Sequence, residues 1–464
     1  MKTTIKSIYM TLAVIALEFY PGASVLPQAS QPPTVTTNAA TNVTASSATL
    51  TGTVNPNSLS TSVQFQYGTT TSYGSNTASQ TFTGGTTQNV AANISGLSVG
   101  TTYHFRIVAT NSAGTSYGSD MTFTTCPTFA YVSNYNNVSV INTSTNAVVA
   151  TVWAGSSPYG VAVKPDGSRV YVANNGSNNV SVIDTSTNAV VATVTVGSSP
   201  QGVAVTPDGS RVYVTSGSNN VSVIDTSTNT VVATVPVGYP GFVAVTPDGS
   251  RVYVTSGSNN VSVIDTSTNM VVATVPIGSS PFGVAVTPDG SRVYVANSGS
   301  NNVSVINTST NMVVATVPVG SSPYGVAVKP DGSRVYVANN NSDNVSVIDT
   351  STNAVVATVT VGVCPFGVAV TPDGSRVYVA NYCSKSVSVI DTSNNTVVAR
   401  VTVPAVPFAL GNFIGTVPCS MPMVTTNAAT NVTTSAATLH GTVNPDGLST
   451  SVHFQYGTTT SYGS

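Results

Sequence analysis

The sequence predicts an all-β protein whose largest part is a seven-bladed β-propeller, and three observations lead to this fold class. The 464-residue chain has no Glu after Glu18, while Val, Thr and Tyr recur at alternate positions, which favours strands over helices. The turn PDGSR recurs every 40 to 42 residues, which is the length of a four-stranded propeller blade. Each interval contains four short runs, such as GVAV, RVYV, NVSVID and VVATVPV, separated by turn residues.

The number of blades follows from counting these runs separately. A set of the last three runs occurs seven times, beginning near Ala130, Val170, Val212, Val252, Val293, Val335 and Val377. A complete VAV run occurs only six times, and a leftover strand, PFALGNFIG, follows the last set at Pro407–Gly415. In an open array the missing first VAV run and the extra C-terminal strand would stay unpaired. In a closed ring the C-terminal strand can complete the first blade. We therefore expect a ring from Phe129 to Gly415 within a propeller domain of residues 126–419.

Residues 1–24 have the pattern of a secretory signal peptide. Lys2 and Lys6 precede an apolar run from Ile8 to Leu17, and small residues follow. The alternative, a buried N-terminal helix, is disfavoured because no other amphipathic helix is expected to pack against it. Residues 25–33 are expected to form a linker.

Charge and hydropathy exclude several partners. The formal net charge is -2, so there is no electrostatic reason to expect binding to nucleic acid or to an anionic membrane. Beyond the N-terminal run no apolar stretch has the length of a membrane span, so no direct membrane insertion is expected. We expect the mature protein to be exported and to be extracellular or at the cell surface.

The segments on both sides of the ring have the strand spacing of a β-sandwich. Residues 34–125 contain runs such as SATLTGTV, SVQFQYG and TYHFRIVATNSAG. Thr425–Ser464 repeats Thr36–Ser75 with few changes and then stops. Residues 420–464 are therefore expected to be an incomplete second copy of the domain.

Two families share these patterns. The run VYVTSGSNNVSVIDTSTNTVVATVPVG closely resembles the YVTN-type β-propeller repeat of archaeal and bacterial surface-layer and cell-surface proteins. Residues 34–125 resemble a fibronectin type III domain through Leu97, Gly100, Tyr103 and the turn NSAG, with Leu50 near the place where that family usually has a Trp. The first resemblance implies a role in surface layers or adhesion. Neither resemblance identifies a site, because propellers carry many unrelated activities.

The ring lacks the residues that catalysis commonly uses. It contains no Glu, and the three His residues of the chain lie outside it: His104, His440 and His453. A hydrolase resembling the lactonase or phosphotriesterase families would need Glu, Asp, Asn or His ligands around a metal in the channel. The Asp residues of the ring recur at turns instead, so we expect no enzyme activity, no metal and no cofactor. Recurrent pairs such as Arg169 and Asp184 are expected to be structural, with Arg292 and Asn307 as an exception.

Aromatic residues at the entry to the innermost strands are the candidate ligand-binding residues. The variable position of the loop GSSPxG and the closing strand supply Tyr159, Gln201, Phe282, Tyr324, Phe366 and Phe408, and the loop GYPGF differs, with Tyr239 and Phe242. Innermost strands line a propeller channel, so the aromatic members would form a broken ring at its mouth that could stack on sugars or grip a peptide. The alternative is that these side chains are packing between blades. The variable loops between second and third strands are expected on the same face.

The four Cys residues of an exported chain allow three pairings. Cys364 and Cys383 lie in two loops of one blade, while Cys126 and Cys419 flank the ring. We predict the disulfides Cys364–Cys383 and Cys126–Cys419, the second of which would clamp the closing strand. Metal binding is disfavoured because the chain has neither Cys-x-x-Cys nor a His in the ring.

Together these observations predict a non-enzymatic exported protein in which the propeller is a rigid binding or assembly module and the flanking domains are spacers. Its expected partners are a cell-surface glycan or protein, or further copies of itself. Two alternatives stay open. One is a propeller enzyme, such as a lactonase-like hydrolase or a redox carrier, with an unrecognised channel site. The other is a purely architectural protein that only self-associates.

Overall fold

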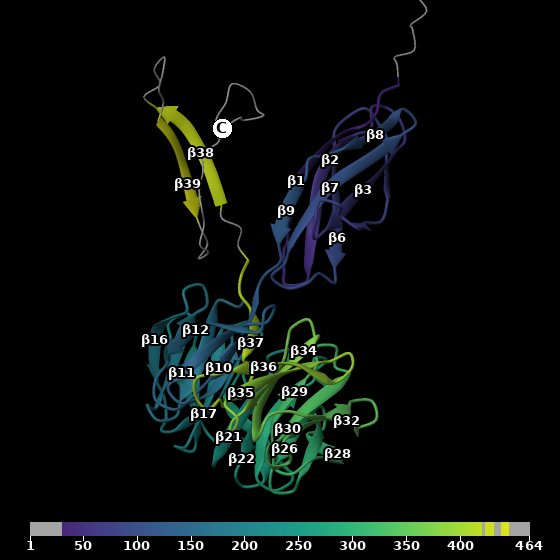
Figure 1. Cartoon of the computed structure of the whole chain (residues 1–464). Helices are drawn as coiled ribbons and strands as arrows, with labels where there is room; N and C mark the ends of the chain where they lie inside the picture. The colour runs from purple at the N-terminus through teal and green to yellow at the C-terminus, as the bar shows by residue number, and fades with distance from the viewer. Residues whose placement is uncertain (1–29, 420–422, 431–437, 445–464) are drawn as a thin grey trace, which may run out of the picture.

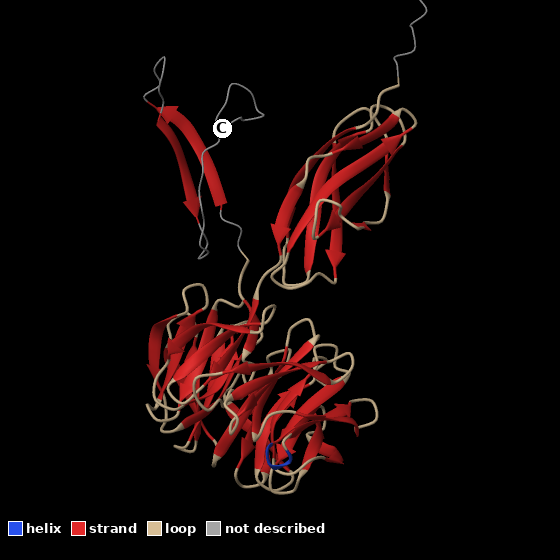
Figure 2. Ribbon diagram, viewed as in Figure 1, coloured by secondary structure: helices blue, strands red, loops and turns tan. Residues whose placement is uncertain are grey.

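The computed structural model describes residues 30–419, 423–430 and 438–444. The regular secondary structure of these residues is β-strand, apart from one short 3-10 helix, η1 (Asn340–Ser342), and loops and turns connect the strands, as Figure 2 shows. Within this part of the chain, no helix has the length and apolar character that crossing a membrane requires. The predicted signal peptide, residues 1–24, and most of the predicted linker lie outside the described residues.

The first folded unit is a sandwich of two β-sheets. Its strands are β1 (Thr34–Thr41), β2 (Ser47–Asn55), β3 (Thr61–Gly68), β4 (Ser75–Asn76), β5 (Gln80–Phe82), β6 (Gln88–Ser95), β7 (Thr102–Asn111), β8 (Gly114–Tyr117) and β9 (Met121–Thr124). One sheet has the order β1-β2-β6, and the other has β4-β3-β7-β8 with β5 on β3 and β9 on β7. Leu50, Phe65, Phe105 and Ile107 are fully buried in its core. The expected sandwich architecture is present, and the fibronectin type III resemblance stays a prediction.

Seven four-stranded antiparallel sheets form the blades of the propeller (Figure 1). The first blade contains β10 (Thr128–Ser133), β11 (Asn137–Asn142), β12 (Ala147–Trp153) and β37 (Ile414–Thr416). The second and third contain β13 (Pro158–Val163), β14 (Arg169–Asn174), β15 (Asn179–Asp184), β16 (Ala189–Thr195), β17 (Pro200–Val205), β18 (Arg211–Ser216), β19 (Asn220–Asp225) and β20 (Thr230–Pro236). The fourth and fifth contain β21 (Pro240–Val245), β22 (Arg251–Ser256), β23 (Asn260–Asp265), β24 (Met270–Pro276), β25 (Pro281–Val286), β26 (Arg292–Asn297), β27 (Asn302–Asn307) and β28 (Met312–Pro318). The sixth and seventh contain β29 (Pro323–Val328), β30 (Arg334–Asn339), β31 (Asn344–Asp349), β32 (Ala354–Thr360), β33 (Pro365–Val370), β34 (Arg376–Asn381), β35 (Ser386–Asp391) and β36 (Thr396–Thr402). The predicted all-β, seven-bladed fold is confirmed.

The ring closes in its first blade, where β37 pairs antiparallel with β10. The C-terminal strand therefore completes the first blade, as predicted, but it is shorter than the expected strand Pro407–Gly415. The chain bends before β37 because Ala409 (φ 41°) and Gly411 (φ 102°) have left-handed backbones. Regular pairing is reduced there to a single parallel bridge between Leu410 and Gly160 of the second blade. We call residues 404–416 the closing segment.

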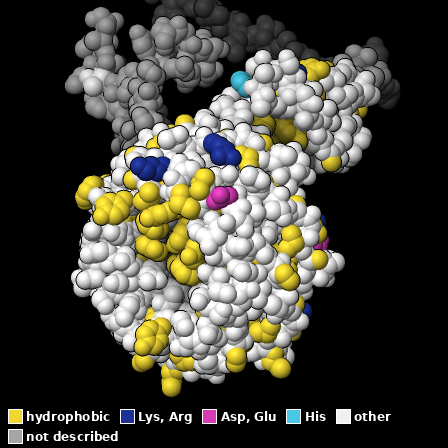
Figure 3. All heavy atoms as spheres, turned by 60° about the horizontal axis from the view of Figure 1, so that its bottom comes forward, with side chains coloured by type: hydrophobic (Ala, Val, Ile, Leu, Met, Phe, Trp, Pro, Cys, Tyr) yellow, Lys and Arg dark blue, Asp and Glu magenta, His cyan; other side chains and the backbone are white. Residues whose placement is uncertain are grey.

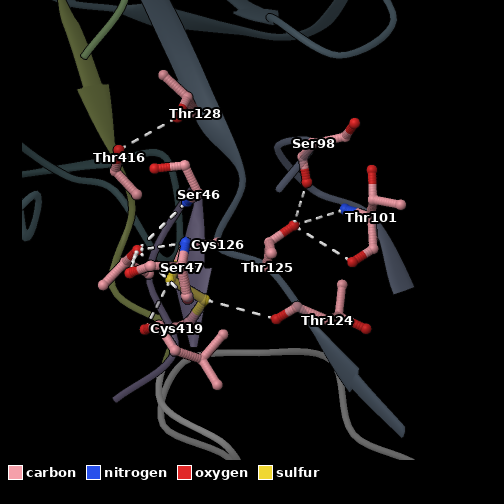
Figure 4. The surroundings of a disulfide bond; sticks show 12 residues. Ser46, Ser47, Ser98, Thr101, Thr124, Thr125, Cys126, Thr128, Thr416 and Cys419 are labelled. Carbon is pink, nitrogen blue, oxygen red and sulfur yellow. Dashed lines mark hydrogen bonds between the residues drawn. A yellow bond between two sulfur atoms is a disulfide. The ribbon is translucent and has the colours of Figure 1, made fainter. Parts of the chain in front are cut away.

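The predicted disulfide Cys126–Cys419 joins the two ends of the ring (Figure 4). Its Cα atoms are 5.0 Å apart, and it links residues 293 positions apart in the sequence. The Cys126 amide also donates to the Thr44 carbonyl oxygen of the sandwich, at 2.9 Å. Beside the disulfide, Thr125 Oγ1 donates to the Ser98 carbonyl oxygen at 2.6 Å. The same few residues therefore close the ring and attach the sandwich to it.

Blade packing repeats around the ring, and each blade buries one large tyrosine at the centre of its second strand. These residues are Tyr131, Tyr171, Tyr213, Tyr253, Tyr294, Tyr336 and Tyr378. At four blade boundaries the tyrosine hydroxyl donates to an Asn that ends an outer turn of the next blade: Tyr213 to Asn269, Tyr253 to Asn311, Tyr294 to Asn353, and Tyr378 to Asn146. Each of these Asn residues has a left-handed backbone, which Asn tolerates better than most residues. By contrast, the buried Tyr131 hydroxyl has no hydrogen-bond partner within the described residues.

We expect Tyr378→Phe to lower the free energy of unfolding by about 1 kcal/mol, because it leaves the partly buried Asn146 oxygen without its donor. Tyr131→Phe is the matched control, and it should leave stability unchanged or raise it, because it removes a buried hydroxyl that has no partner. Urea unfolding of both variants measures the difference. Equal destabilisation by the two changes would contradict a stabilising role for the Tyr–Asn bond.

The second copy of the sandwich pattern is described only as a hairpin of β38 (Met423–Thr430) and β39 (Thr438–Asn444). Val424 lies opposite Val443 in this hairpin, as Val35 lies opposite Val54 in the pair β1 and β2, and both pairs have a register shift at the same place. The sequence repeat is therefore repeated in strand register. The other residues of the expected incomplete domain lie outside the described part of the chain.

Candidate functional site

The loops of the ring lie on two faces. The loops that enter innermost strands and the loops between second and third strands share one face, which we call the aromatic face. In the second blade, for example, Pro158 pairs with Asn174 at this end of the hairpin, and Val163 pairs with Val170 at the other. The PDGSR and DTSTN turns lie on the opposite side, which we call the turn face.

The structure brings the five predicted ligand-binding aromatics together at the channel mouth. Phe366 is at their centre, with its ring centroid 4.9 Å from that of Tyr324, 5.6 Å from Phe408, and 6.0 Å from both Tyr159 and Phe282. Tyr159 also stacks on Phe408 at 4.4 Å, and Phe282 meets Tyr324 edge-on at 4.4 Å. The rings therefore contact one another across the mouth rather than forming an open circle.

Three more residues belong to the same group. Phe242 packs on Phe282 at 5.1 Å, Tyr382 packs on Phe408 at 5.1 Å, and Leu410 of the closing segment joins them. We call these eight residues the aromatic cluster. Phe242 was predicted only to lie near the ring of aromatics, and Tyr382 was not predicted, although its position next to Cys383 was a usable signal. Tyr239, in the same loop as Phe242, is 70% exposed.

Burial divides the aromatic cluster into two parts. The side chains of Phe242, Phe366 and Leu410 are buried, which is what packing requires. The remaining five are half-buried and retain accessible ring surface: Tyr159, Phe282, Tyr324, Tyr382 and Phe408. Burial raises the pKa of Tyr159, so its hydroxyl stays protonated at neutral pH and can donate a hydrogen bond. The cluster thus has a packed base and an accessible outer layer.

The closing segment holds its part of the cluster through backbone bonds. The Leu410 carbonyl oxygen accepts from the Val161 amide at 2.8 Å, and the Asn412 carbonyl oxygen accepts from the Val163 amide at 2.9 Å. On its other side, the Phe408 amide donates to the Ser133 carbonyl oxygen at 2.9 Å. Phe408 and Leu410 are therefore fixed between the first and second blades.

A cavity of about 620 Å³ occupies the channel behind the aromatic cluster. Its walls are the Val and Ala residues of the innermost strands, and Phe242 and Leu410 form part of its lining, so the cluster closes this end. The other end is lined by Lys164, Pro165, Pro330 and Pro372 of the turn face. The side chains of this lining are mainly apolar, and polar backbone atoms are exposed between them.

The second predicted disulfide, Cys364–Cys383, is also present, with Cα atoms 5.3 Å apart. Cys364 precedes β33 and Cys383 follows β34, so the bond joins two loops of the aromatic face within the seventh blade. Phe366 lies two positions after one cysteine, and Tyr382 immediately precedes the other. The disulfide therefore restrains the backbone on both sides of two cluster residues.

The aromatic face carries few charges around its apolar centre, as Figure 3 shows. Its charged residues among the described part of the chain are Asp343, Lys385 and Arg400. Asp343 Oδ1 accepts from the Cys364 amide at 2.8 Å, and Arg400 Nη2 donates to the Val361 carbonyl oxygen at 3.1 Å. Two of the three charges thus support loops, so binding at this face would depend mainly on ring surfaces and neutral polar groups.

The turn face carries most of the charge of the ring, and its charges have structural partners. The side-chain hydroxyl of Thr206, with the amide and hydroxyl of Ser210, lowers the pKa of Asp208 to about 2. Five Arg–Asp ion pairs join second and third strands: Arg169–Asp184, Arg211–Asp225, Arg251–Asp265, Arg334–Asp349 and Arg376–Asp391. Arg292, opposite Asn307, has no acidic partner within the described residues, as expected from the sequence. These carboxylates stay ionised and are occupied by hydrogen bonds and ion pairs at the turns. A general acid or base would need a carboxylate that is free to exchange a proton.

Potential metal ligands do not gather in the described part of the chain, where no group of three or more His, Cys, Asp or Glu residues is placed to hold a metal ion. Three histidines were expected to lie outside the ring. Of these, His104 lies in the sandwich on β7 and His440 lies on β39. His453 falls outside the described residues.

Comparison with known proteins gives one family match and many structural matches. Residues 187–405 match the virginiamycin B lyase family, which is less than half of the chain. No curated protein matches the sequence. Hydrazine synthase of Kuenenia stuttgartiensis is 27% identical, with a TM-score of 0.52, and the alignment covers 62% of this chain and 92% of that one.

A protein of unknown function from Desulfotomaculum acetoxidans is 21% identical, with a TM-score of 0.54 over 63% of this chain and 99% of that one. In all, 1200 solved chains match, so the fold is too widespread to identify a function by itself. The family match and these structures agree with a β-propeller, and the YVTN and fibronectin resemblances stay predictions.

Proposed function

We propose that this protein is a non-enzymatic, exported protein of the cell surface or the extracellular space. In this proposal the propeller is a rigid binding module, the sandwich domains are spacers, and the aromatic face binds a cell-surface glycan or protein. Two disulfides support export, because such bonds persist mainly in oxidising compartments.

The observation that carries the proposal is the accessible outer layer of the aromatic cluster. Its half-buried rings are supported from below by Phe366 and from the side by a disulfide, so little ordering is left for a ligand to impose. Rigid aromatic surfaces with small polar neighbours suit the faces of sugar rings or a peptide backbone. The sandwich attaches near the turn face, where Ser144 Oγ donates to the Val99 carbonyl oxygen at 3.1 Å, and it leaves the aromatic face uncovered (Figure 1).

Two substitutions in the cluster test this proposal. We expect the full chain to bind one class of ligand saturably when it is screened against cell-wall polysaccharides, host glycans and surface proteins. Tyr159→Ala and Tyr324→Ala should each weaken that binding by about tenfold or more, as expected for central aromatic contacts. Isothermal titration with the ligand that the screen identifies measures the loss.

The matched control is Tyr239→Ala, because Tyr239 lies on the same face but 70% of its side chain is exposed and it lies outside the cluster. This variant should bind like the unaltered protein, and thermal unfolding should show that all three variants are folded. Equal loss with Tyr239→Ala, or unchanged binding with both cluster variants, would remove the aromatic cluster as the binding site.

A second candidate is a propeller enzyme, because residues 187–405 match a lyase family and an apolar cavity lies in the channel. The test is incubation of the protein with virginiamycin B, lactones and glycans in the presence and absence of divalent cations. Ring opening or cleavage that is lost when the cavity is filled, for example by Ala285→Phe, would favour this candidate. Turnover in the cavity variant equal to that of the unaltered protein would exclude the channel cavity as the active site.

The purely architectural alternative has its own structural support. The outermost strands expose pairs of valines around the ring: Val148 and Val149, Val190 and Val191, Val231 and Val232, Val271 and Val272, Val313 and Val314, and Val355 and Val356. Exposed strand edges of this kind favour association with further copies. Sedimentation velocity over a wide concentration range tests this alternative. Assembly into larger species at higher concentration would support it, whereas the binding proposal does not need self-association.

A further inference from the structure

The sandwich domain concentrates its few ionisable side chains at one place. Residues 34–125 contain a single His, a single Arg and a single Asp, with no Lys or Glu. These three, His104, Arg106 and Asp120, lie together with two tyrosines on the outer surface of the six-stranded sheet. His104 and Arg106 alternate along β7 with the inward-facing Phe105 and Ile107, so their side chains project away from the core.

Asp120 organises one half of this group. Its Oδ2 lies 2.7 Å from His104 Nδ1, and its Oδ1 accepts a 2.9 Å hydrogen bond from the Tyr73 hydroxyl. Both carboxylate oxygens therefore have partners inside the domain. Partial burial and then the hydrogen bond to Asp120 raise the pKa of Tyr73, so its hydroxyl stays protonated and continues to donate.

Arg106 occupies the other half and is held by ring faces rather than by an acid. Its guanidinium carbon lies 4.7 Å from the ring centroid of Tyr73 and 4.4 Å from that of Tyr117. Its Nε donates to Gln66 Oε1 at 2.9 Å. Within the described residues, the two terminal nitrogens of Arg106 have no hydrogen-bond partner and the side chain has no ion pair. These two nitrogens form a planar pair of donors that can make a bidentate hydrogen bond to a carboxylate.

The group is held in position before any ligand arrives. Tyr73 has a left-handed backbone, φ 60°, which is unusual for a bulky residue and which places its ring over Arg106. Tyr117 is 56% exposed and leaves much of its surface free beside the guanidinium. An oriented cation next to an exposed aromatic ring matches a sugar that carries an acid group, since the ring stacks on the sugar and the guanidinium binds the carboxylate.

We propose that Arg106 and Tyr117, oriented by Tyr73, Gln66 and the Asp120–His104 pair, form a binding site for carboxylate-bearing sugars of an acidic polysaccharide. This site lies on the sandwich, apart from the aromatic cluster, and it does not depend on the function proposed for the propeller. In this proposal the sandwich domain binds a ligand of its own and is not only a spacer.

The test uses the full chain and oligogalacturonate as the probe, measured by titration calorimetry at low and at physiological salt. We expect saturable binding to the unaltered protein, with a sulfated glucan and polyglutamate bound more weakly and dextran not bound. Arg106→Gln should weaken binding about tenfold or more, because a charge-assisted bidentate contact is lost. Tyr117→Ala should also weaken it, and since Tyr117 is mostly exposed this variant should fold normally.

Arg292→Gln is the matched control, because it removes a propeller guanidinium that also has no acidic partner within the described residues. It should leave oligogalacturonate binding unchanged. Absence of binding by the unaltered protein would overturn the proposal, as would equal loss with Arg292→Gln. Tighter binding of the sulfated glucan or of polyglutamate would overturn the assignment to sugar carboxylates.

Discussion

Replacing Cys126 and Cys419 together by Ser is expected to lower the free energy of unfolding by about 4 to 5 kcal/mol, because this disulfide closes a loop that contains the whole ring. In the unfolded chain its removal frees two ends that are 293 positions apart. In the folded state it frees the chain that follows β37 from the connection between β9 and β10. Urea unfolding under oxidising conditions, followed by circular dichroism and tyrosine fluorescence, measures the change.

The Cys364→Ser, Cys383→Ser double variant is the internal control, because that disulfide closes a loop with a sequence separation of only 19. It should cost about 3 kcal/mol, which is less than the ring-closing pair. Greater destabilisation by the 364–383 variant would show that loop length does not govern these two bonds. A further readout is limited proteolysis, in which only the Cys126, Cys419 variant should be cleaved readily within the closing segment.

Phe413→Ala is expected to destabilise the protein by about 3 to 5 kcal/mol, as large-to-small changes at buried phenylalanines do. The Phe413 side chain is completely buried in the core cluster that contains residues of the first, second and seventh blades. The Phe413 carbonyl oxygen also accepts from the Tyr131 amide at 2.8 Å, which fixes the chain beside β10. The substitution therefore weakens the junction inside the first blade, where β37 pairs with β10 without a loop that joins the two strands.

Hydrogen exchange locates this effect. Amides of β10 and β11 should exchange faster in Phe413→Ala than in the unaltered protein, whereas those of β22 and β23, across the ring, should change little. Phe408→Ala, in the same segment but half-buried, should cost less. Uniform acceleration around the ring would show that closure is no weaker than the other blade boundaries.

Much of the architecture could be predicted from the sequence because the ring repeats one pattern. The spacing of PDGSR gave the blade length, and the missing first VAV run located the point of closure, which the pairing of β37 with β10 confirms. The two disulfides could be predicted because Cys126 and Cys419 flank the ring, while Cys364 and Cys383 lie in loops that strand alternation places on one face. In each case the repeat fixed which segments lie next to each other, and this left one strand pairing and one pair of disulfides to expect.

The features that could not be predicted depend on side chains and turns that depart from the pattern. The left-handed backbones of Ala409 and Gly411 shorten the expected closing strand, and nothing in PFALGNFIG indicates them beyond the glycine. The aromatic side chains were expected to form a broken ring around the mouth, but Phe366 lies at its centre and contacts the rings of Tyr324 and Phe408. The group around Arg106 was missed because Tyr73, Arg106 and Tyr117 are distant in sequence and meet only across the sheet.

The late position of β37 also affects how the protein is made. The first blade begins at Thr128 but receives its innermost strand only from Ile414–Thr416. At about 5 to 20 residues per second, synthesis of the chain between these points takes roughly 15 to 60 seconds. Throughout that interval the nascent chain presents the open edge of β10 to other unfinished chains, whose repeated strands are similar in sequence to its own. We therefore expect the yield of folded protein to fall when unfinished chains are crowded together before the C-terminal strand has emerged.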